Sequence, residues 1–156
     1  MMQGEGVDLA KYEQIYKQGN KRVSCDPFQI GVHSYITLDD PYNLINHFCT
    51  PNLAIKGERS IVATRDIKAG EELAYDYSST EWTPQDYPPY YTDGWPMVCN
   101  CGGAECRKVI ACFPYLPQAI QTKYLESKAI QDHILEKLTW SEERKRCYIC
   151  EKELGI

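Results

Sequence analysis

Residues 46–52 read Asn-His-Phe-Cys-Thr-Pro-Asn, and residues 66–77 read Asp-Ile-Lys-Ala-Gly-Glu-Glu-Leu-Ala-Tyr-Asp-Tyr. The first stretch brings an amide, an imidazole and a thiol close together, and the second ends in a tyrosine whose hydroxyl can orient a substrate. Residues 66–70 are typical of a turn, and residues 73–77 predict a β-strand. The two stretches therefore predict chemically useful side chains held by β structure.

The residues before the first stretch, and those between the two stretches, predict further short strands. Apolar side chains alternate with others over residues 28–32, and residues 35–38 form a second β run that ends at the turn residues 39–41. These two segments predict a hairpin, and residues 59–64 predict another strand. We therefore expect a mainly β domain with short helices, in the α+β class.

Helices are expected near both ends of the chain. Residues 8–16 have the cap and the apolar spacing of a short helix, and residues 117–138 show the apolar steps of four that are typical of one or two helices. Residues 78–97 contain too many prolines for regular structure and interleave tyrosine with tryptophan. The chain accordingly divides into an atypical N-terminal segment, a β core, an aromatic acidic loop, a cysteine segment and a C-terminal helical tail, at residues 1–27, 28–80, 81–97, 98–116 and 117–156.

The composition argues against several classes of protein. The chain has 156 residues, 43% of them hydrophobic, and a formal net charge of −5. This length suits one folded domain, and the negative charge disfavours broad binding to nucleic acid backbones. No stretch is long and apolar enough to cross a membrane, and residues 1–10 lack the order of a secretory signal. We expect an intracellular protein, cytoplasmic or nuclear, without direct nucleic acid or membrane binding.

The chain has eight cysteines, which in a reducing compartment suggest metal or redox chemistry. Cys99, Cys101 and Cys106 form C-x-C-x4-C, and two glycines between them let the backbone fold tightly. This spacing favours structural zinc, Zn2+, which needs four ligands. The alternative is a set of buried thiols without metal. The candidates for the fourth ligand are, in order of preference, Cys49, Cys112 and Cys25.

Cys147 and Cys150 form a separate C-x-x-C near the C-terminus. No second pair accompanies it in the tail. The spacing is compatible with half of a zinc site, a redox pair or two thiols without a function, and it does not choose among them.

The motifs at residues 46–52, 66–77 and 99–106, taken in this order, resemble those of the SET-domain protein-lysine methyltransferases. The resemblance covers about residues 28–116, and the C-x-C-x4-C falls where that family carries its post-SET zinc cysteines. It implies a SET-like β fold with a pseudoknot, in which the second motif threads past the first, followed by a post-SET zinc segment and here a C-terminal helix.

The resemblance also implies roles for individual residues. Asn46 and His47 match residues that hold the cofactor S-adenosylmethionine, and Tyr77 matches the catalytic tyrosine. Tyr75 matches a position where Phe or Tyr influences how many methyl groups are added, and its hydroxyl leaves less room for an amine that is already methylated. We therefore expect monomethylation. Cys49 matches the fourth zinc ligand, beside Cys99, Cys101 and Cys106.

The sequence departs from the family pattern near its start. Family members usually begin with a Gly-x-Gly strand and turn that cradle the methionine end of the cofactor, and further strands follow. Residues 1–27 are too few to supply all of this, and Gly4-Glu5-Gly6-Val7, which has the letters of the motif, is followed by a helical pattern. The resemblance is therefore that of an N-terminally shortened member, with Phe48 and Ala74 where Ser and Thr are common.

Together these features predict an S-adenosylmethionine-dependent protein-lysine N-methyltransferase that acts on a lysine-containing basic protein or peptide, histone-like in charge. Residues 71–95 favour such a partner, because they carry six acidic side chains and no Lys or Arg. An acidic surface with aromatic side chains attracts cations by steering and cation–π contact. A solvated loop without a partner is the plainer interpretation of the same residues.

Three alternatives concern function and assembly. In the first alternative, the chain is a degenerate, non-catalytic SET fold that serves as a zinc-stabilised peptide-binding or scaffolding module. A cysteine hydrolase using Cys49 with His47 is disfavoured, because their side chains need not meet and a zinc-bound thiolate is not free to attack. A shortened sheet would also expose an edge strand, which a second copy of the chain could cover in a homodimer.

Overall fold

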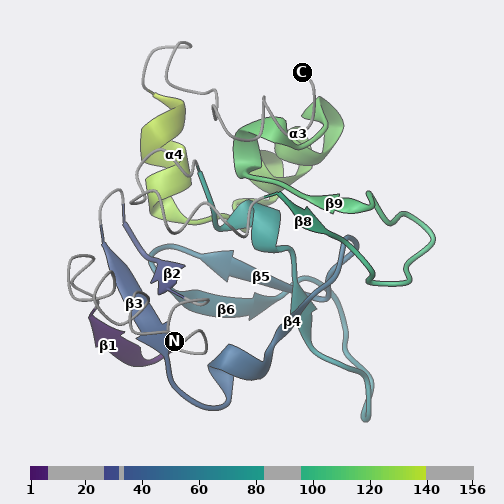
Figure 1. Ribbon diagram of the computed structural model, residues 1–156, viewed down its shortest axis with the longest axis horizontal. Helices are drawn as coiled ribbons and strands as arrows, with labels where there is room; N and C mark the ends of the chain where they lie inside the picture. The colour runs from purple at the N-terminus through teal and green to yellow at the C-terminus, as the bar shows by residue number, and fades with distance from the viewer. Residues whose placement is uncertain (7–26, 32–33, 83–95, 140–156) are drawn as a thin grey trace.

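The computed structural model describes residues 1–6, 27–31, 34–82 and 96–139. In this part of the chain, small β-sheets lie beneath two α-helices (Figure 1). None of the described helices is long and apolar enough to cross a membrane. Several predicted features lie outside the described residues: the helix of residues 8–16, most of the aromatic acidic loop, Cys25, and the pair Cys147 and Cys150.

The first sheet has the strand order β1-β3-β2, with all pairs antiparallel. Its strands are β1 (Gly4–Gly6), β2 (Pro27–Gln29) and β3 (Tyr35–Leu38). The pairing of β2 with β3 confirms the predicted hairpin. Gly4 is required in β1, since a Cβ at this position would lie 1.8 Å from the backbone oxygen of Thr37. The Gly-x-Gly letters of the N-terminus therefore form an edge strand of this sheet.

A second hairpin joins β5 (Leu53–Lys56) to β6 (Ser60–Ala63). Gly57 at its turn has φ +66°, a conformation that favours glycine. Strand β6 confirms the strand predicted for residues 59–64, whereas β5 was not predicted. Its residues 53–55 are all buried, so the alternation that marks a half-buried strand is missing there.

The two motifs meet in a parallel pair of very short strands, β4 (Asn46–His47) and β7 (Ala74–Tyr75). In register, Asn46 lies opposite Ala74 and His47 opposite Tyr75. This neighbourhood is the one expected from the pseudoknot. The prediction that the strand continues through residue 77 was wrong, because the Asp76 carboxylate accepts a hydrogen bond from the Ser78 N–H and starts the 3-10 helix η2 (Tyr77–Ser79).

The cysteine segment is held by an antiparallel pair, β8 (Met97–Val98) with β9 (Val109–Ile110). After it come the 3-10 helix η5 (Phe113–Tyr115) and the helices α3 (Gln118–Ser127) and α4 (Asp132–Leu138). Two helices in residues 117–138 confirm one of the two forms predicted for this segment. The break between them contains Lys128 in a left-handed conformation, with φ 53°.

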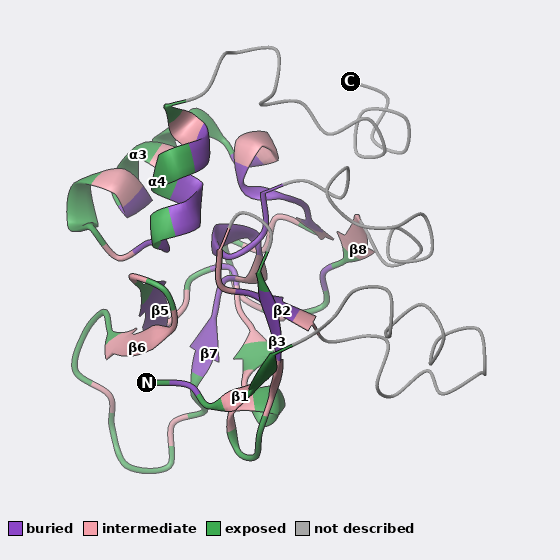
Figure 2. Ribbon diagram, turned by 90° about the vertical axis from the view of Figure 1, so that its left-hand side faces the viewer, coloured by how far each residue is buried: buried purple, intermediate pink, exposed green. Residues whose placement is uncertain are grey.

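Side-chain packing and hydrogen bonds join the helices to the sheets. Figure 2 shows buried residues on both helices and in the middle of the molecule. One apolar cluster lies among the sheets and includes Phe28, Ile36 and Ile55. Another lies under the helices, where the Trp82 and Phe113 rings stack with centroids 6.4 Å apart. This packing fixes the helical segment on the β core.

The start of α4 is also fixed by the buried side chain of Gln131. Its Nε2 donates to the backbone oxygens of Gln29 at 2.8 Å and Glu58 at 2.7 Å. The Gly57 N–H donates to the Ile130 oxygen, and the Asp132 N–H donates to the Gly57 oxygen. Backbone groups of β2 and of the β5–β6 turn thus find their partners in the helical segment.

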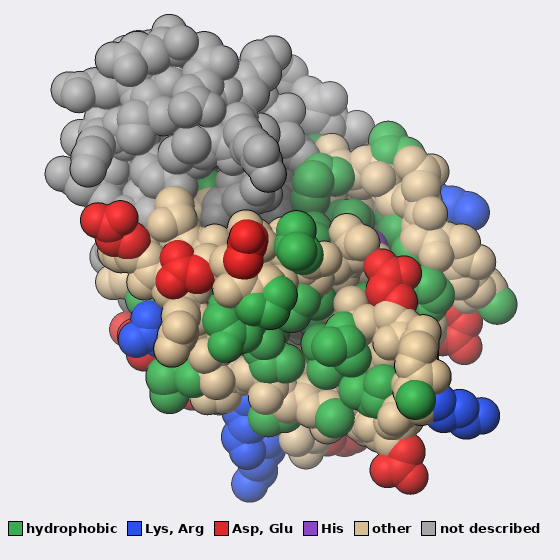
Figure 3. Space-filling view, turned by 90° about the horizontal axis from the view of Figure 1, so that it is seen from below, with side chains coloured by type: hydrophobic (Ala, Val, Ile, Leu, Met, Phe, Trp, Pro, Cys, Tyr) green, Lys and Arg blue, Asp and Glu red, His purple; other side chains and the backbone are tan. Residues whose placement is uncertain are grey.

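The opposite face of the molecule carries apolar side chains in contact with solvent. Figure 3 shows hydrophobic side chains gathered in the middle of this lower face, with charged side chains around them. The large hydrophobic residues exposed in the described part of the chain include Leu44, at the end of the 3-10 helix η1 (Tyr42–Leu44), and Leu73.

Candidate functional site

A cavity of about 590 Å³ lies where the two motifs meet the cysteine segment. Asn46 and His47 of β4, Tyr77 of η2 and Cys101 all line it. A cavity of this size is typical of a small-molecule site, and most of its lining residues are polar. The remaining lining residues come from the same three segments and from the turn between β6 and β7: Phe48, Thr50, Asn52, Arg65, Glu71, Glu72, Ala74, Asn100 and Ile110.

His47 is held in one orientation by its two ring nitrogens. Its Nδ1 accepts a hydrogen bond from the Tyr77 N–H at 3.2 Å, and its Nε2 lies 3.3 Å from the Cys49 sulfur. Burial lowers the pKa of His47, although the nearby Asp76 carboxylate opposes this shift. The neutral ring therefore accepts at Nδ1 and presents its N–H to the cysteine.

Asn46 and Asn52 form a polar wall together with two glutamates. The Asn46 amide donates to the Glu72 carboxylate at 2.9 Å, which leaves the Asn46 carbonyl oxygen to accept from another group. Asn52 is buried and spans β5 and β7: its amide donates to Glu71 and to the Glu72 backbone, and its carbonyl accepts from the Ala74 N–H at 3.0 Å. Asn52 thus holds the second motif against the first.

The outer rim of the cavity carries an ion pair between Arg65 and Glu71. Hydrogen bonds from Arg65, then from Asn52 and the Lys68 N–H, lower the pKa of Glu71 to about 2. Glu71 therefore stays ionised and engaged with its own neighbours. Glu72 at the same rim is exposed and accepts a hydrogen bond from the neutral amide of Asn46. Its negative charge is therefore less fully compensated than that of Glu71.

The two tyrosines of the second motif occupy different environments. Tyr77 is half-buried at the cavity, and its hydroxyl donates to the Ile45 backbone oxygen at 2.9 Å. Tyr75 is buried in the cluster among the sheets, with its ring 4.9 Å from that of Tyr77 and 6.3 Å from that of Phe28. Tyr75 is not among the residues lining this cavity, so it contacts the site through the Tyr77 ring.

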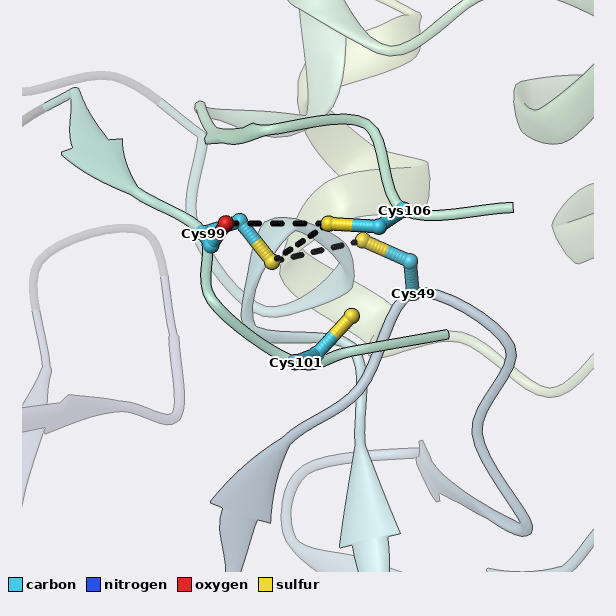
Figure 4. A group of neighbouring side chains, drawn as sticks. All are labelled: Cys49, Cys99, Cys101 and Cys106. Atoms are coloured by element: carbon cyan, nitrogen blue, oxygen red, sulfur yellow. Dashed lines mark hydrogen bonds between the residues drawn. The ribbon is translucent and has the colours of Figure 1, made fainter. Parts of the chain in front are cut away.

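The structure brings together the four cysteines predicted as zinc ligands. The sulfurs of Cys49, Cys99, Cys101 and Cys106 all lie within 4.8 Å of one another and converge on one point (Figure 4). Cys99 Sγ lies 3.6 Å from Cys49 Sγ and 3.5 Å from Cys106 Sγ. With zinc–sulfur bonds of about 2.3 Å, the sulfurs of a tetrahedral site lie about 3.8 Å apart. The spacing therefore fits zinc.

The environment of the cluster acts on its thiols in opposite directions. Backbone N–H groups of Arg107 and Lys108 donate to the sulfurs of Cys49 and Cys106, each at 3.4 Å. Burial raises the pKa of Cys99 to about 12. Burial also acts to raise the pKa of Cys101, but N–H donors and the neighbouring thiols outweigh it and lower that pKa to about 6. Because a metal ion binds the thiolate form, these N–H donors favour its binding.

One prediction about this region needs correction, and the cysteine hydrolase is disfavoured on different grounds. The side chains of His47 and Cys49 do meet, at 3.3 Å, although their separation in sequence did not require it. Burial raises the pKa of Cys49, and its sulfur belongs to the cluster, so a hydrolase remains disfavoured. The acidic surface is also smaller than expected, because Asp76 and Glu81 are buried rather than exposed.

Sequence reasoning missed two residues that connect the parts of the site. Asp76 was placed within a strand, yet its carboxylate is buried and 2.7 Å from the Arg107 guanidinium. Arg107 follows the last cysteine of the cluster, and its guanidinium also donates to the Cys49 backbone oxygen at 3.3 Å. A lone acidic residue between two tyrosines and a basic residue after a cysteine are weak local signals, which explains the omission.

The chain is similar in sequence to known proteins. The sequence model of the SET domain matches residues 7–78. The ASHH3 histone-lysine N-methyltransferase of Arabidopsis thaliana is 36% identical over 81 residues, which are 47% of the chain and 19% of that protein. A histone-lysine N-methyltransferase of Mycosarcoma maydis, named as H3 lysine-4 specific, is 39% identical over 119 residues, which are 69% of the chain and 8% of that protein.

A third relative, the ASHR3 histone-lysine N-methyltransferase of Arabidopsis thaliana, is 27% identical over 116 residues, or 67% of the chain and 21% of that protein. The chain spans about a fifth or less of the length of these relatives. The SET match, the small sheets with their paired motifs, and the four cysteines after them define one class of protein. Residues 7–78 match the SET domain, and the chain carries a post-SET cysteine cluster after that match.

Proposed function

We propose that this protein is an S-adenosylmethionine-dependent protein-lysine N-methyltransferase. The observation that carries the proposal is the cavity that Tyr77 lines together with Asn46 and His47, two neighbours about 30 residues earlier in the sequence, beside the cysteine cluster. The relatives named as histone-lysine N-methyltransferases support the same reaction.

The cavity residues suit a polar cofactor. Asn46 has a carbonyl oxygen left to accept a hydrogen bond once its amide donates to Glu72. The backbone around His47 is fixed by the pairing of β4 with β7, so that it presents a rigid wall. Zinc bound by Cys49, Cys99, Cys101 and Cys106 would keep the cysteine segment folded against this wall, where Cys101 and Asn100 also line the cavity. We assign cofactor binding to Asn46 and His47 on these grounds.

Methyl transfer is an in-line displacement that needs a neutral, desolvated amine held in line with the methyl carbon. S-adenosylmethionine supplies that methyl group on a positively charged sulfonium. A lysine amine has a pKa of about 10.4 in water, and an apolar surrounding and a nearby cation both lower it. Tyr77, whose hydroxyl is fixed by the Ile45 oxygen, would orient the amine and line its path. No strong general base is then required.

The substrate class follows from the relatives and from charge. We propose a lysine-containing basic protein, histone-like in charge, as the substrate, because the relatives are named for histone lysines. The carboxylate of Glu72 at the cavity rim, together with the formal net charge of −5, attracts a basic peptide. Such a substrate places the protein inside the cell, in the nucleus or the cytoplasm.

The direct test is calorimetric titration of S-adenosylmethionine into the zinc-loaded protein. We expect micromolar binding in the wild type, and at least about tenfold weaker binding in Asn46→Ala, which loses an accepting oxygen in the wall. Asn43→Ala is a matched control, since Asn43 is exposed and does not line the cavity. In a methylation assay on histone peptides, Tyr77→Phe should lower kcat about a hundredfold or more while cofactor binding persists.

The outcome also separates the proposal from its alternative. A folded, zinc-loaded wild type that shows neither heat of binding nor a thermal shift with the cofactor contradicts the enzyme. It would favour a non-catalytic SET fold that binds peptides or serves as a scaffold. Retained peptide binding under those conditions would support that second function directly.

A further inference from the structure

The carboxylate of Asp76 is the point where three parts of the chain meet. Its side chain is fully buried. In the sequence, Asp76 lies between Tyr75, the last residue of β7, and Tyr77, the first residue of η2. Its Oδ1 accepts from the Ser78 N–H at 3.0 Å and from the Arg107 guanidinium at 2.7 Å. Its Oδ2 accepts from the Tyr124 hydroxyl at 2.9 Å. A buried carboxylate is stable only with such partners, so each of them controls where it sits.

Each partner of Asp76 leads to a different element. Arg107 contacts the cysteine cluster, because its guanidinium donates to the Cys49 backbone oxygen and its own N–H donates to the Cys49 sulfur. Tyr124 is buried in α3, which lies beyond the residues that match the SET domain. The cavity wall is also close to Asp76, because His47 lines the cavity and its Nδ1 lies 3.4 Å from the same carboxylate. Asp76 therefore joins α3 both to the cysteine cluster and to the cavity wall.

We propose that Tyr124 of α3 is a positioning residue for the cofactor cavity and the metal cluster, acting through the hydrogen bond between its hydroxyl and Asp76. Helix α3 then contributes to the geometry of the site. The inference rests on the proposed function for its effect on catalysis. Its effect on the metal cluster can be measured independently of that function.

Loss of the Tyr124 hydroxyl would leave Oδ2 without the one hydrogen bond that the described residues give it. A carboxylate in this position turns or shifts toward other donors, since an unsatisfied buried oxygen is costly. Asp76 is covalently joined to Tyr77, so a shift carries the Tyr77 ring and the donor to His47 with it. It also alters the Arg107 contact that supports Cys49. Both sites should therefore loosen together.

The test compares Tyr124→Phe, which keeps the ring and its packing, with Ser127→Ala as the matched control. Ser127 lies on the same helix, and its hydroxyl bonds the backbone oxygen of Tyr124 without reaching Asp76. Zinc release to a chromophoric chelator and calorimetric binding of S-adenosylmethionine are measured for each protein. We expect about tenfold faster zinc release and about tenfold weaker cofactor binding for Tyr124→Phe, in line with losses of supporting hydrogen bonds elsewhere. Ser127→Ala should match the wild type in both.

A double variant shows whether the effect passes through Asp76. In the Asp76→Asn background, Tyr124→Phe should add less than about twofold to either readout, because residues of one network are not additive. Equal zinc release in Tyr124→Phe and wild type would overturn the inference, whatever the cofactor result. A wild type that binds zinc but no cofactor would overturn the proposed function alone, and the zinc arm would still decide the role of Tyr124.

Discussion

The backbone N–H of Tyr77 donates to Nδ1 of His47 at 3.2 Å, across 30 residues of sequence. The bond requires the His47 ring to be an acceptor at Nδ1, so the neutral ring carries its proton on Nε2, which faces the Cys49 sulfur at 3.3 Å. One imidazole thus joins the tyrosine segment to the cysteine cluster. His47 can therefore position both the Tyr77 segment and the cysteine cluster without taking part in a chemical step itself.

Replacing His47 tests that arrangement. His47→Phe keeps an aromatic ring but removes both the acceptor for Tyr77 and the donor to Cys49. We expect the free energy of unfolding to fall by about 1–3 kcal/mol, the usual cost of leaving a buried hydrogen-bonding group unpaired, and cofactor affinity to fall at least about tenfold. Urea denaturation and calorimetry measure the two effects. Unchanged stability and affinity would mean that these contacts do not position the site.

The cysteine cluster predicts a specific pattern of metal loss. Cys49→Ala should lose the bound zinc, measured as metal content per chain, because three thiols no longer complete a tetrahedral site. Cys112→Ala should keep it, since Cys112 is buried outside the cluster of four. Chelation of the wild type should lower its melting temperature, because metal binding contributes to folding. Zinc retained by Cys49→Ala, or lost from Cys112→Ala, would contradict the assignment of the fourth ligand.

Tyr75 carries the prediction about product multiplicity. Its ring packs against Tyr77, and the Tyr75→Phe change removes one hydroxyl from this tight region. We expect wild-type protein to yield mainly monomethyl-lysine and Tyr75→Phe to shift the product toward dimethyl- and trimethyl-lysine, since the Tyr77 ring, which packs against Tyr75 and lines the cavity, can then shift and leave more room for a methylated amine. Tyr42→Phe, a tyrosine packed at the margin of the same apolar cluster, serves as the control. Mass spectrometry that finds mainly trimethylated product from the wild type would contradict this interpretation.

The sequence predicted the cluster of four cysteines better than the short strands around it. Cys99, Cys101 and Cys106 were identified as a ligand set because metal coordination imposes close spacing, which is visible locally. The pairing of β4 with β7 left no local signal beyond its motifs, since each strand has two residues and the contact is formed across the chain. That pairing was expected only through the family resemblance.

The errors have physical causes as well. The strand β7 ends at Tyr75 because the Asp76 carboxylate bonds the Ser78 N–H, a competition between side chain and backbone that periodicity does not report. The same carboxylate was counted as part of an exposed acidic surface, yet Arg107 and Tyr124 neutralise and cover it. Both partners come from segments distant in sequence. Long-range partners of a charged residue decide its burial, and they cannot be inferred from the residue's own neighbours.

The last prediction concerns pH, through a buried histidine of α4. His133 is 2% exposed, and burial lowers its pKa to about 4 from the ordinary 6.5; Lys137 also lowers it, and the Thr80 backbone opposes the shift. In the unfolded chain the ring binds a proton more readily, so the stability held by the neutral ring is complete above about pH 6.5 and is lost as the pH falls to about 4. The loss is about 3 kcal/mol. Urea unfolding of wild type and His133→Gln across this range should give curves that converge on acidification, whereas parallel curves would contradict the prediction.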